Sequence, residues 1–292
     1  MLTADSYLRY SIDVTTETQA QSAVAAKARG TPALRLVHVS VRLGDRLALD
    51  DIDVEVAAGA FVGLIGPNGS GKSTLLRAVL GVLPLESGSI EVEGKAPEDA
   101  RDLFAYLPQR RQLDLDLPIR AWDVVMMGRI RRTGWLRPLR REDRYAVDRA
   151  LALVGLSDRR NSPIGEMSFG QQQRVFFARA LAQEGSILLL DEPMNGVDPQ
   201  TQELFVDLLR GFHAEGKTIV MATHDLTQAA AMCDNLCVLN QRLIAYGSVA
   251  EVLTEEVLSD AYGVHLHFRP GAAAPGHLLG DVHHHEHDAP DA

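Results

Sequence analysis

The sequence predicts an α/β fold with a parallel sheet core, an antiparallel β subdomain and an inserted α-helical subdomain. Three short runs, AFVGLIG, ILLLDE and TIVMATH, are continuously apolar, which is typical of strands buried on both faces. Amphipathic helical patterns separate these runs, as expected where helices connect parallel strands. Between about residues 110 and 184 no buried strand is indicated, and successive stretches there carry helical periodicity.

Two alternating stretches come before the first buried run. LRLVHVSVRL and LALDDIDVEV each alternate apolar and polar residues, and a Gly44-Asp45 turn lies between them. This pattern predicts paired antiparallel strands. Later in the chain, the pattern of Leu204, Phe205 and Leu208 predicts one apolar helix face.

Neither end of the chain has a clear period. Residues 1–33 are rich in Thr, Ala, Ser and Gln and end with Gly30 and Pro32, so we expect a flexible N-terminal extension. Residues 265–292 are rich in Pro, Gly, Ala and His, and we expect a disordered tail. One domain then occupies residues 34–264, with its helical subdomain at about 110–184.

Composition limits the function. The 292 residues carry a net charge of −10, which disfavours nucleic-acid binding through phosphate neutralisation. With no run of 18 apolar residues and no basic start before an apolar stretch, we expect no membrane span, no secretory signal and a cytoplasmic location. The two cysteines, Cys233 and Cys237, have helical i, i+4 spacing, and we interpret them as small core residues rather than a redox pair.

The stretch GPNGSGKST follows a predicted strand and precedes an amphipathic helix. Glycines there allow backbone N–H groups to close around phosphate oxygens, and the helix N-terminus adds its positive dipole end. Lys72 can reach the β- and γ-phosphates, and the Ser73 hydroxyl can ligate Mg²⁺. The alternative, an ordinary glycine turn, accounts poorly for both the spacing and the flanking elements. The predicted nucleotide-binding residues are Gly66, Pro67, Asn68, Gly69, Ser70, Gly71, Lys72, Ser73 and Thr74.

Two carboxylates end the run ILLLDE. Asp191 lies at the carboxyl end of a buried strand, where α/β sheets bind ligands, and we expect it to hold Mg²⁺. Glu192 is then placed to act as general base on the attacking water. Alone, the pair would only mark a strand end, but beside the phosphate loop the functional interpretation is favoured.

Further motifs follow in a fixed order. YLPQR places Gln109 after a predicted strand, MSFGQQQR opens a helix, NGVDP follows the acidic pair, and MATHD places His224 at a strand end. In this order, over residues 34 to 264, the chain resembles the ATPase subunit of an ABC transporter. The resemblance implies a P-loop NTPase (RecA-like) fold and an ATPase that uses ATP and Mg²⁺ to drive transmembrane transport.

The resemblance also implies roles for matching residues. One subunit of a head-to-tail homodimer would bind Mg-ATP, with Gln109 sensing Mg²⁺ and the water and His224 contacting the γ-phosphate. Three residues of the second subunit, Ser168, Gly170 and Gln171, would cap that phosphate, and Asp198 would cross the interface. From the residues alone, Ser168 and Gln171 fit a capping box that opens a helix toward an anion, and an ordinary capped helix fits equally well. His224 is also compatible with a core histidine.

The chain departs from the family pattern at two places. The family's signature reads L-S-G-G-Q, and Phe169 replaces its first glycine, at a cost of roughly 1–2 kcal/mol if that position requires positive φ. The family stacks adenine on an aromatic residue in the first strand pair, and the matching position is Leu43. Leu43 has no π-face, so we expect weaker adenine binding.

The cargo is suggested by VVMMGRIRRTGWLRPLRREDRYAVDRALALVGL, which resembles the subgroup that serves importers of manganese, zinc or chelated iron. This implies a separate membrane permease, an extracytoplasmic metal-binding protein and a peripheral position on the inner face of the membrane. Siderophore, haem and cobalamin importers are the first alternative. A soluble ABC ATPase without a permease is the second, although the chain has neither a coiled-coil insertion nor a second ATPase domain. Trp122, Trp135, Arg110 and Arg111 are candidate permease contacts or, equally, ordinary core and surface residues.

Four histidines cluster in the tail, where neutral imidazoles can bind Zn²⁺ and similar ions. A cytosolic metal-buffering or sensing tail and a solvated tail without function are equally compatible with the sequence. These residues are His283, His284, His285 and His287.

Overall fold

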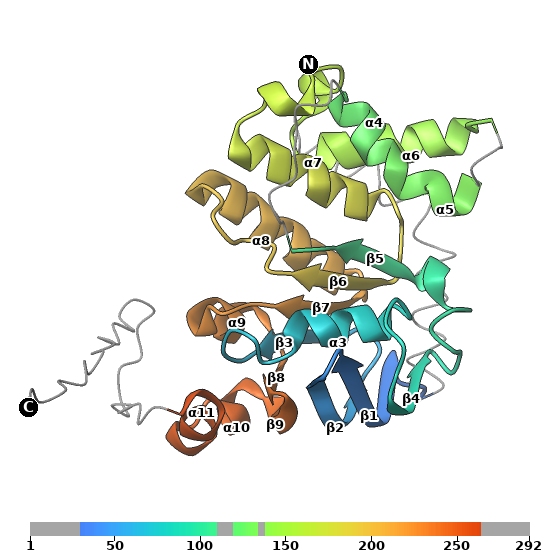
Figure 1. Cartoon of the computed structure of the whole chain (residues 1–292). Coiled ribbons are helices and arrows are strands. Elements are labelled where there is room, and N and C mark those ends of the chain that lie inside the picture. Colours follow the sequence, from blue (N-terminus) through green and yellow to red (C-terminus); the bar gives the residue numbers. More distant parts are fainter. Residues whose placement is uncertain (1–29, 110–118, 134–137, 264–292) are drawn as a thin grey trace, which may run out of the picture.

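The structure is a computed structural model that describes residues 30–109, 119–133 and 138–263. Within these ranges, a central sheet lies between a group of helices on one side and a small antiparallel sheet on the other (Figure 1). Most of the N-terminal extension, the tail histidines and Arg110, Arg111 and Trp135 lie outside the described residues.

The central sheet has the strand order β5-β6-β7-β3-β8-β9. Its first five strands are parallel, and β9 pairs antiparallel with β8 at the edge. The three apolar runs predicted as buried strands are β3, β6 and β7, so these predictions are confirmed. The strands are β3 (Phe61–Ile65), β5 (Phe104–Leu107), β6 (Ile187–Asp191), β7 (Thr218–Ala222), β8 (Asn235–Asn240) and β9 (Arg242–Ser248).

Both faces of the central sheet are covered. Successive side chains of a strand point to opposite faces, so Phe61 and Ile65 enter one hydrophobic cluster, while Val62 and Leu64 enter the other. The first cluster continues into the helices, where the rings of Phe177 and Phe205 stack with centroids 4.3 Å apart. This burial on both faces explains why β3, β6 and β7 read as unbroken apolar runs.

The antiparallel subdomain is a three-stranded sheet with the order β2-β1-β4. Its first two strands are the predicted hairpin, whereas β4 belongs to a stretch that we did not predict as a strand. Bulges interrupt the β1–β2 register, and His38 and Asp51 there have positive φ angles of 51° and 55°. The strands are β1 (Leu34–Leu43), β2 (Arg46–Val56) and β4 (Ser87–Val92).

Helices cover the rest of the central sheet. The predicted helical subdomain is present in its described part and contains α4, α5, α6 and α7, which Figure 1 shows together above β5 and β6. The α-helices are α3 (Lys72–Val79), α4 (Ala121–Met126), α5 (Ile130–Thr133), α6 (Arg141–Leu153), α7 (Phe169–Leu181), α8 (Pro199–Ala214), α9 (Leu226–Met232), α10 (Val249–Val252) and α11 (Glu255–Tyr262). Short 3-10 helices are η1 (Arg101–Leu103), η2 (Met127–Arg129), η3 (Ser157–Arg159) and η4 (Ile164–Glu166).

A buried ion-pair network ties the helical subdomain together. Arg129, only 5% exposed, pairs through Nε with Asp143 Oδ1 at 3.1 Å and through Nη1 with Glu184 Oε2 at 2.5 Å. Its Nη1 also donates to the Ala182 carbonyl at 2.9 Å. Because removing one partner would leave an uncompensated buried charge, this network fixes η2 and α6 against the end of α7.

The two cysteines are both buried, as predicted, but they do not share a helix. Cys233 follows α9 and Cys237 lies in β8, so the helical interpretation of their spacing is wrong. Four residues can connect two elements as well as span one helical turn. Burial raises the pKa of each thiol to about 12, which keeps both protonated and inert.

No helix in the described part of the chain is long and apolar enough to cross a membrane.

Candidate functional site

The predicted site residues from four strands meet at one edge of the central sheet. The carboxyl ends of the parallel strands β5, β6, β7 and β3 are neighbours in the sheet order. Gln109 follows β5, Asp191 ends β6, His224 follows β7, and the loop from Gly66 to Gly71 follows β3. Parallel sheets bind ligands at this edge, so the topology alone gathers residues that are far apart in the sequence.

The phosphate-binding loop depends on glycine for steric reasons. Gly66 has φ 148°, and a Cβ there would lie 2.0 Å from the Leu239 carbonyl oxygen. Gly71 has φ 102° and caps α3 without a side-chain hydrogen bond, which leaves the first-turn N–H groups available to an anion. The loop is also braced from outside, because the Gln241 N–H donates to the Ser70 carbonyl at 2.8 Å.

Lys72 is folded over this loop. Its Nζ donates to the carbonyls of Gly66 at 2.6 Å and Pro67 at 3.0 Å, and the residue is only 6% exposed. Burial lowers the pKa of Lys72, and the nearby charges of Glu192 and Asp191 oppose that shift. A buried ammonium beside a glycine loop at a helix N-terminus is well suited to bind phosphate oxygens.

The residues at the end of β6 fit a divalent cation. Asp191 is 2% exposed, and its Oδ1 accepts a hydrogen bond from the Ser73 hydroxyl at 3.0 Å. Its buried Oδ2 has no hydrogen-bond partner among the described residues. Burial raises the pKa of Asp191, and the Ser73 hydrogen bond partly counteracts this. An orphaned carboxylate oxygen beside a hydroxyl is the oxygen donor set that Mg²⁺ prefers.

Glu192 is held beside this pair by two amides. Gln109 Nε2 donates to Glu192 Oε2 at 3.1 Å, and Asn195 Nδ2 donates to the same oxygen at 2.9 Å. His224 Nδ1 lies 3.9 Å from the other oxygen, Oε1, which is longer than a hydrogen bond. The Glu192 side chain is 10% exposed, and its backbone has a positive φ of 51°. Gln109 therefore contacts Glu192 rather than Asp191 through its side chain.

The predicted start of the signature helix is confirmed as a capped N-terminus. Ser168 Oγ accepts from the Gln171 N–H at 3.3 Å, and Gln171 Oε1 accepts from the Ser168 N–H at 3.1 Å, which forms a capping box. Phe169 is the first residue of α7 and is not among the described residues with positive φ. The residue at this position therefore causes no left-handed strain, and Phe169 remains 47% exposed.

Gly170 allows α7 to approach α8 closely. A Cβ on Gly170 would lie 2.1 Å from Asp198 Oδ2, a distance that no real contact allows. Asp198 caps α8 by accepting from the Thr201 N–H at 2.9 Å and from its hydroxyl at 2.8 Å. Arg174 Nε in turn donates to Thr201 Oγ1 at 2.9 Å, which joins α7 to α8.

Most of the predicted site residues fall into two groups, which Asn195 and Thr201 join although they were not predicted. We call the first the phosphate-loop cluster; its members are residues 66–74, Gln109, Asp191, Glu192, Asn195 and His224. We call the second the helix-start cluster; its members are Ser168, Phe169, Gly170, Gln171, Asp198 and Thr201. The two clusters adjoin at one point, because a Cβ on Gly196, the residue after Asn195, would lie 3.5 Å from the Phe169 ring.

Sequence reasoning missed Asn195 and Thr201. Asn195 lies inside the quoted stretch NGVDP, three residues after Glu192, and its own N–H bonds the Glu192 carbonyl at 3.3 Å. That turn spacing is a detectable signal for a side chain that folds back on Glu192. Thr201 has a similar signal, because it is three residues after a capping aspartate.

Leu43 ends β1 and is 44% exposed. It pairs across the hairpin with Arg46, whose Nη2 donates to the Gly69 carbonyl at 3.2 Å. The end of this hairpin is therefore adjacent to the phosphate loop. The resemblance implies this placement for Leu43, the position that would contact the adenine.

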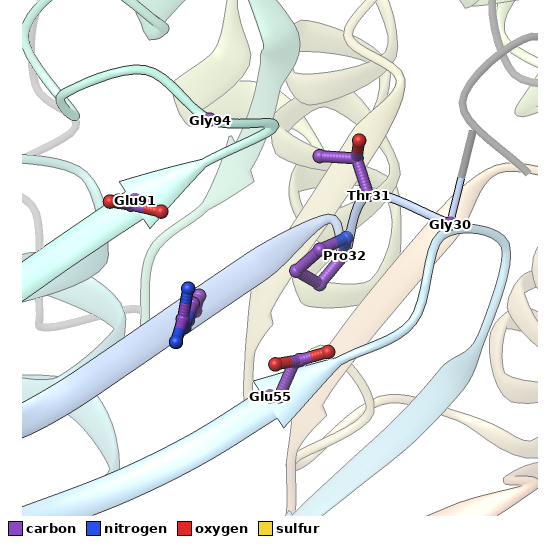
Figure 2. A pocket seen from close by; sticks show the side chains of 7 residues that line it. Gly30, Thr31, Pro32, Glu55, Glu91 and Gly94 are labelled. Carbon is purple, nitrogen blue, oxygen red and sulfur yellow. The ribbon is translucent and has the colours of Figure 1, made fainter.

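A pocket of about 390 Å³ lies elsewhere, on the antiparallel subdomain (Figure 2). It is lined by Thr31, Pro32, Glu55 and Glu91, with Arg35 paired between the two glutamates in the sheet register. None of the predicted site residues lines this pocket.

One further group in the described part has side chains of the types that bind metals. His38 Nδ1 lies 2.8 Å from Asp51 Oδ1 and 3.1 Å from Asp53 Oδ2, and all three residues are exposed. Their mutual hydrogen bonding accounts for this arrangement without an ion.

A glycine loop at a helix N-terminus, a buried lysine and a strand-end acid pair define the class of protein: a nucleotide-binding ATPase of the P-loop type. Comparison with known families identifies it further. The ABC transporter family model matches residues 49–195, and the chain belongs to this family. It is an ATP-hydrolysing subunit of the kind that works with transmembrane permeases.

Individual relatives agree with this assignment. The chain is 40% identical over 231 residues to the manganese transport system ATP-binding protein MntB of Halalkalibacterium halodurans, covering 79% of this chain and 92% of that protein. It is 42% identical over 232 residues to the zinc transport system ATP-binding protein TroB of Treponema pallidum, covering 79% and 87%. Among solved structures, the ADP conformation of an ATP-binding cassette of an ABC transporter matches with a TM-score of 0.67 and 26% identity, covering 78% of this chain and 97% of that one.

Proposed function

We propose that this chain is the motor subunit of an importer of manganese, zinc or iron. The observation that carries the catalytic part is the convergence of the phosphate loop, Asp191 and Glu192 at one edge of the sheet. The cargo is supported by relatives named for manganese and zinc transport and, at 37% identity, by the chelated iron transport system protein YfeB of Yersinia pestis.

Binding of ATP is assigned to the phosphate loop. Backbone N–H groups of the non-proline residues in 66–74 would surround the phosphates. Lys72 Nζ would then donate to phosphate oxygens in place of the loop carbonyls. Ser73, Asp191 and Gln109 would hold Mg²⁺, which supplies neutralisation of the phosphate charge. The buried Asp191 Oδ2 without a partner supports this assignment.

Hydrolysis is assigned to Glu192. The carboxylate would accept a proton from water while the water oxygen forms a bond to the γ-phosphorus. The bond to the β–γ bridging oxygen breaks, and its electron pair leaves with ADP. His224, 59% exposed and beside Glu192 Oε1, is placed to contact the transferred phosphate.

The helix-start cluster is assigned to a second copy of the chain. The exposure of Phe169 and the capped helix N-terminus at Ser168 support a head-to-tail homodimer, in which Ser168, Gly170 and Gln171 of one copy complete the ATP site of the other. Asp198 would then lie at the interface. ATP would hold the dimer closed, and hydrolysis would release it.

The remaining parts of the system follow from this function. The chain would act at the inner face of the membrane, bound to a permease through its helical subdomain, and an extracytoplasmic metal-binding protein would deliver the cargo. Trp122 stays a candidate for the permease contact, although its Nε1 donates to Asp148 Oδ1 at 3.0 Å within the subdomain.

The catalytic assignment is tested with Glu192→Gln. We expect this variant to bind ATP and to hydrolyse it roughly 10²- to 10⁴-fold more slowly, because the amide cannot accept the proton. Size-exclusion chromatography with ATP would then detect a trapped dimer. Turnover at the parent rate would disprove the role of Glu192 as base.

The cargo is tested by elemental analysis of cells with and without the chain, grown on limiting manganese, zinc or iron. A selective manganese or zinc deficit identifies the cargo. An iron deficit that appears only with a supplied chelator favours a chelate importer, and an unchanged metal content removes the import proposal while the ATPase stands.

A further inference from the structure

The oxygen atoms of Glu192 are in different environments. Oε2 accepts two hydrogen bonds, from Asn195 Nδ2 at 2.9 Å and from Gln109 Nε2 at 3.1 Å. A carboxylate oxygen has two lone pairs available to donors, so Oε2 is saturated. Oε1 accepts no hydrogen bond from the part of the chain that the structure describes, and His224 Nδ1 lies 3.9 Å from it.

The two amide donors differ in how they are attached. Asn195 is part of the same tight turn as Glu192, since its N–H bonds the Glu192 carbonyl at 3.3 Å. The turn itself is anchored, because the Glu192 N–H donates to the Ala222 carbonyl at 3.0 Å and the Glu192 backbone is held at φ 51°. Gln109 comes from a separate element, two residues after β5.

We propose that Asn195 is a positioning residue for hydrolysis, one that keeps Glu192 Oε2 occupied so that Oε1 is the oxygen that takes the proton from water. This inference rests on the proposed role of Glu192 as base. Gln109 is assigned to Mg²⁺ during the reaction and would then leave Oε2. Asn195 cannot leave in the same way, because its backbone is fixed three residues from Glu192.

A further consequence concerns the identity of residue 195. An amide N–H donor stabilises the ionised carboxylate and fixes its rotamer. A carboxylate at the same position has the same shape but repels Glu192 at this short distance. The chemistry therefore requires a donor at position 195, and not merely a side chain of that size.

The test compares Asn195→Ala with Asn195→Asp in the full-length chain, with ATPase rates measured over a range of ATP concentrations. For Asn195→Ala we expect kcat to fall roughly 5- to 10-fold, in the range of one lost hydrogen bond, with KM for ATP unchanged. For Asn195→Asp we expect a larger fall in kcat, although Asp is the closer match in shape. Asn161→Asp, the same chemical change at an exposed position elsewhere, is the matched control and should retain the parent rate.

Several results would overturn the proposal. If Asn195→Asp turns over at the parent rate, no donor is needed. If both variants raise KM and leave kcat unchanged, or if Ala is worse than Asp, residue 195 acts by packing rather than on Glu192. Glu192→Gln distinguishes failure of the proposed base from failure of the positioning role. Parent activity in Glu192→Gln would reject Glu192 as the base. An inactive Glu192→Gln together with a fully active Asn195→Asp would reject only the positioning role of Asn195.

Discussion

The phosphate-loop cluster and the helix-start cluster differ in how complete they are within one chain. In the first, Lys72 and Asp191 are 6% and 2% exposed, and hydrogen bonds join α3 to the end of β6 and the loop after β5 to the loop after β6. In the second, Phe169 is 47% exposed and Ser168 satisfies only its own helix end. One cluster is thus preorganised by the sheet, while the other presents a capped helix end to solvent.

This difference indicates which cluster serves nucleotide binding and which serves turnover. Buried groups that the sheet already holds close together need little reorganisation to bind a charged ligand, so nucleotide binding should belong to the single chain. An exposed helix start, whose capping box satisfies only its own N–H groups, is expected to contribute when another surface meets it. Variants in the two clusters should therefore separate binding from turnover.

The largest effect on binding is expected for Lys72→Ala. Loss of a buried charged donor to phosphate should weaken ATP binding roughly 10- to 100-fold, measured by titration calorimetry on the monomeric chain. Lys95→Ala, at an exposed turn of the antiparallel subdomain, is the matched control and should bind like the parent. Unchanged affinity in Lys72→Ala would contradict the assignment of the loop and would remove the comparison between the clusters.

An effect of similar size, on turnover rather than on ATP binding, is expected for Gly170→Ala. The added Cβ would lie 2.1 Å from Asp198 Oδ2, so either the helix start or the Asp198 carboxylate that caps α8 must move. We expect ATPase turnover to fall on the order of 10- to 100-fold, as misplaced catalytic groups do. Binding of ATP to the single chain should stay within about twofold, because Gly170 is not part of the phosphate-loop cluster.

Gly211→Ala provides the control for that substitution. Gly211 lies within α8, and a Cβ there would meet nothing within 4 Å. The change should leave turnover intact and raise the free energy of unfolding by about 1 kcal/mol, since alanine is the better helix former. Weakened ATP binding by Gly170→Ala in the single chain would show that the two clusters are coupled.

The smallest effect is expected for the charge of Asp198. Hydrogen bonds from the Thr201 N–H and hydroxyl lower the pKa of Asp198. A carboxyl whose pKa is lower in the folded state stabilises the fold above its unfolded pKa of about 3.9, and this contribution is lost as pH falls through the folded pKa. Asp198→Asn keeps a capping oxygen but not the charge.

The melting temperature of Asp198→Asn should therefore lie below that of the parent at neutral pH, and the two should converge in acid. Thermal unfolding between about pH 3 and about pH 7 measures this. Asp207→Asn, at an exposed position of the same helix, is the control. A difference that is constant with pH would mean that the capping geometry, and not the charge, is responsible.

Much of the fold could be predicted because its signals are local. β3, β6 and β7 are buried on both faces, so their apolar runs are unbroken and easy to detect. β4 was not predicted because SGSIEV has few apolar residues and depends on pairing with β1. β8 was missed for a related reason, since NLCVLN is short, and the spacing of Cys233 and Cys237 was compatible with a helix.

The sequence by itself determined the phosphate loop, the strand-end acids and the capping box, because each depends on residues within one turn or one strand end. Only the tertiary structure decided that Gln109 reaches the Glu192 oxygen, and that Gly170 lies against the Asp198 carboxylate. These contacts join elements whose separation in the sequence carries no information about distance. The order of strands in the sheet sets that distance, and burial then decides which polar atoms have partners.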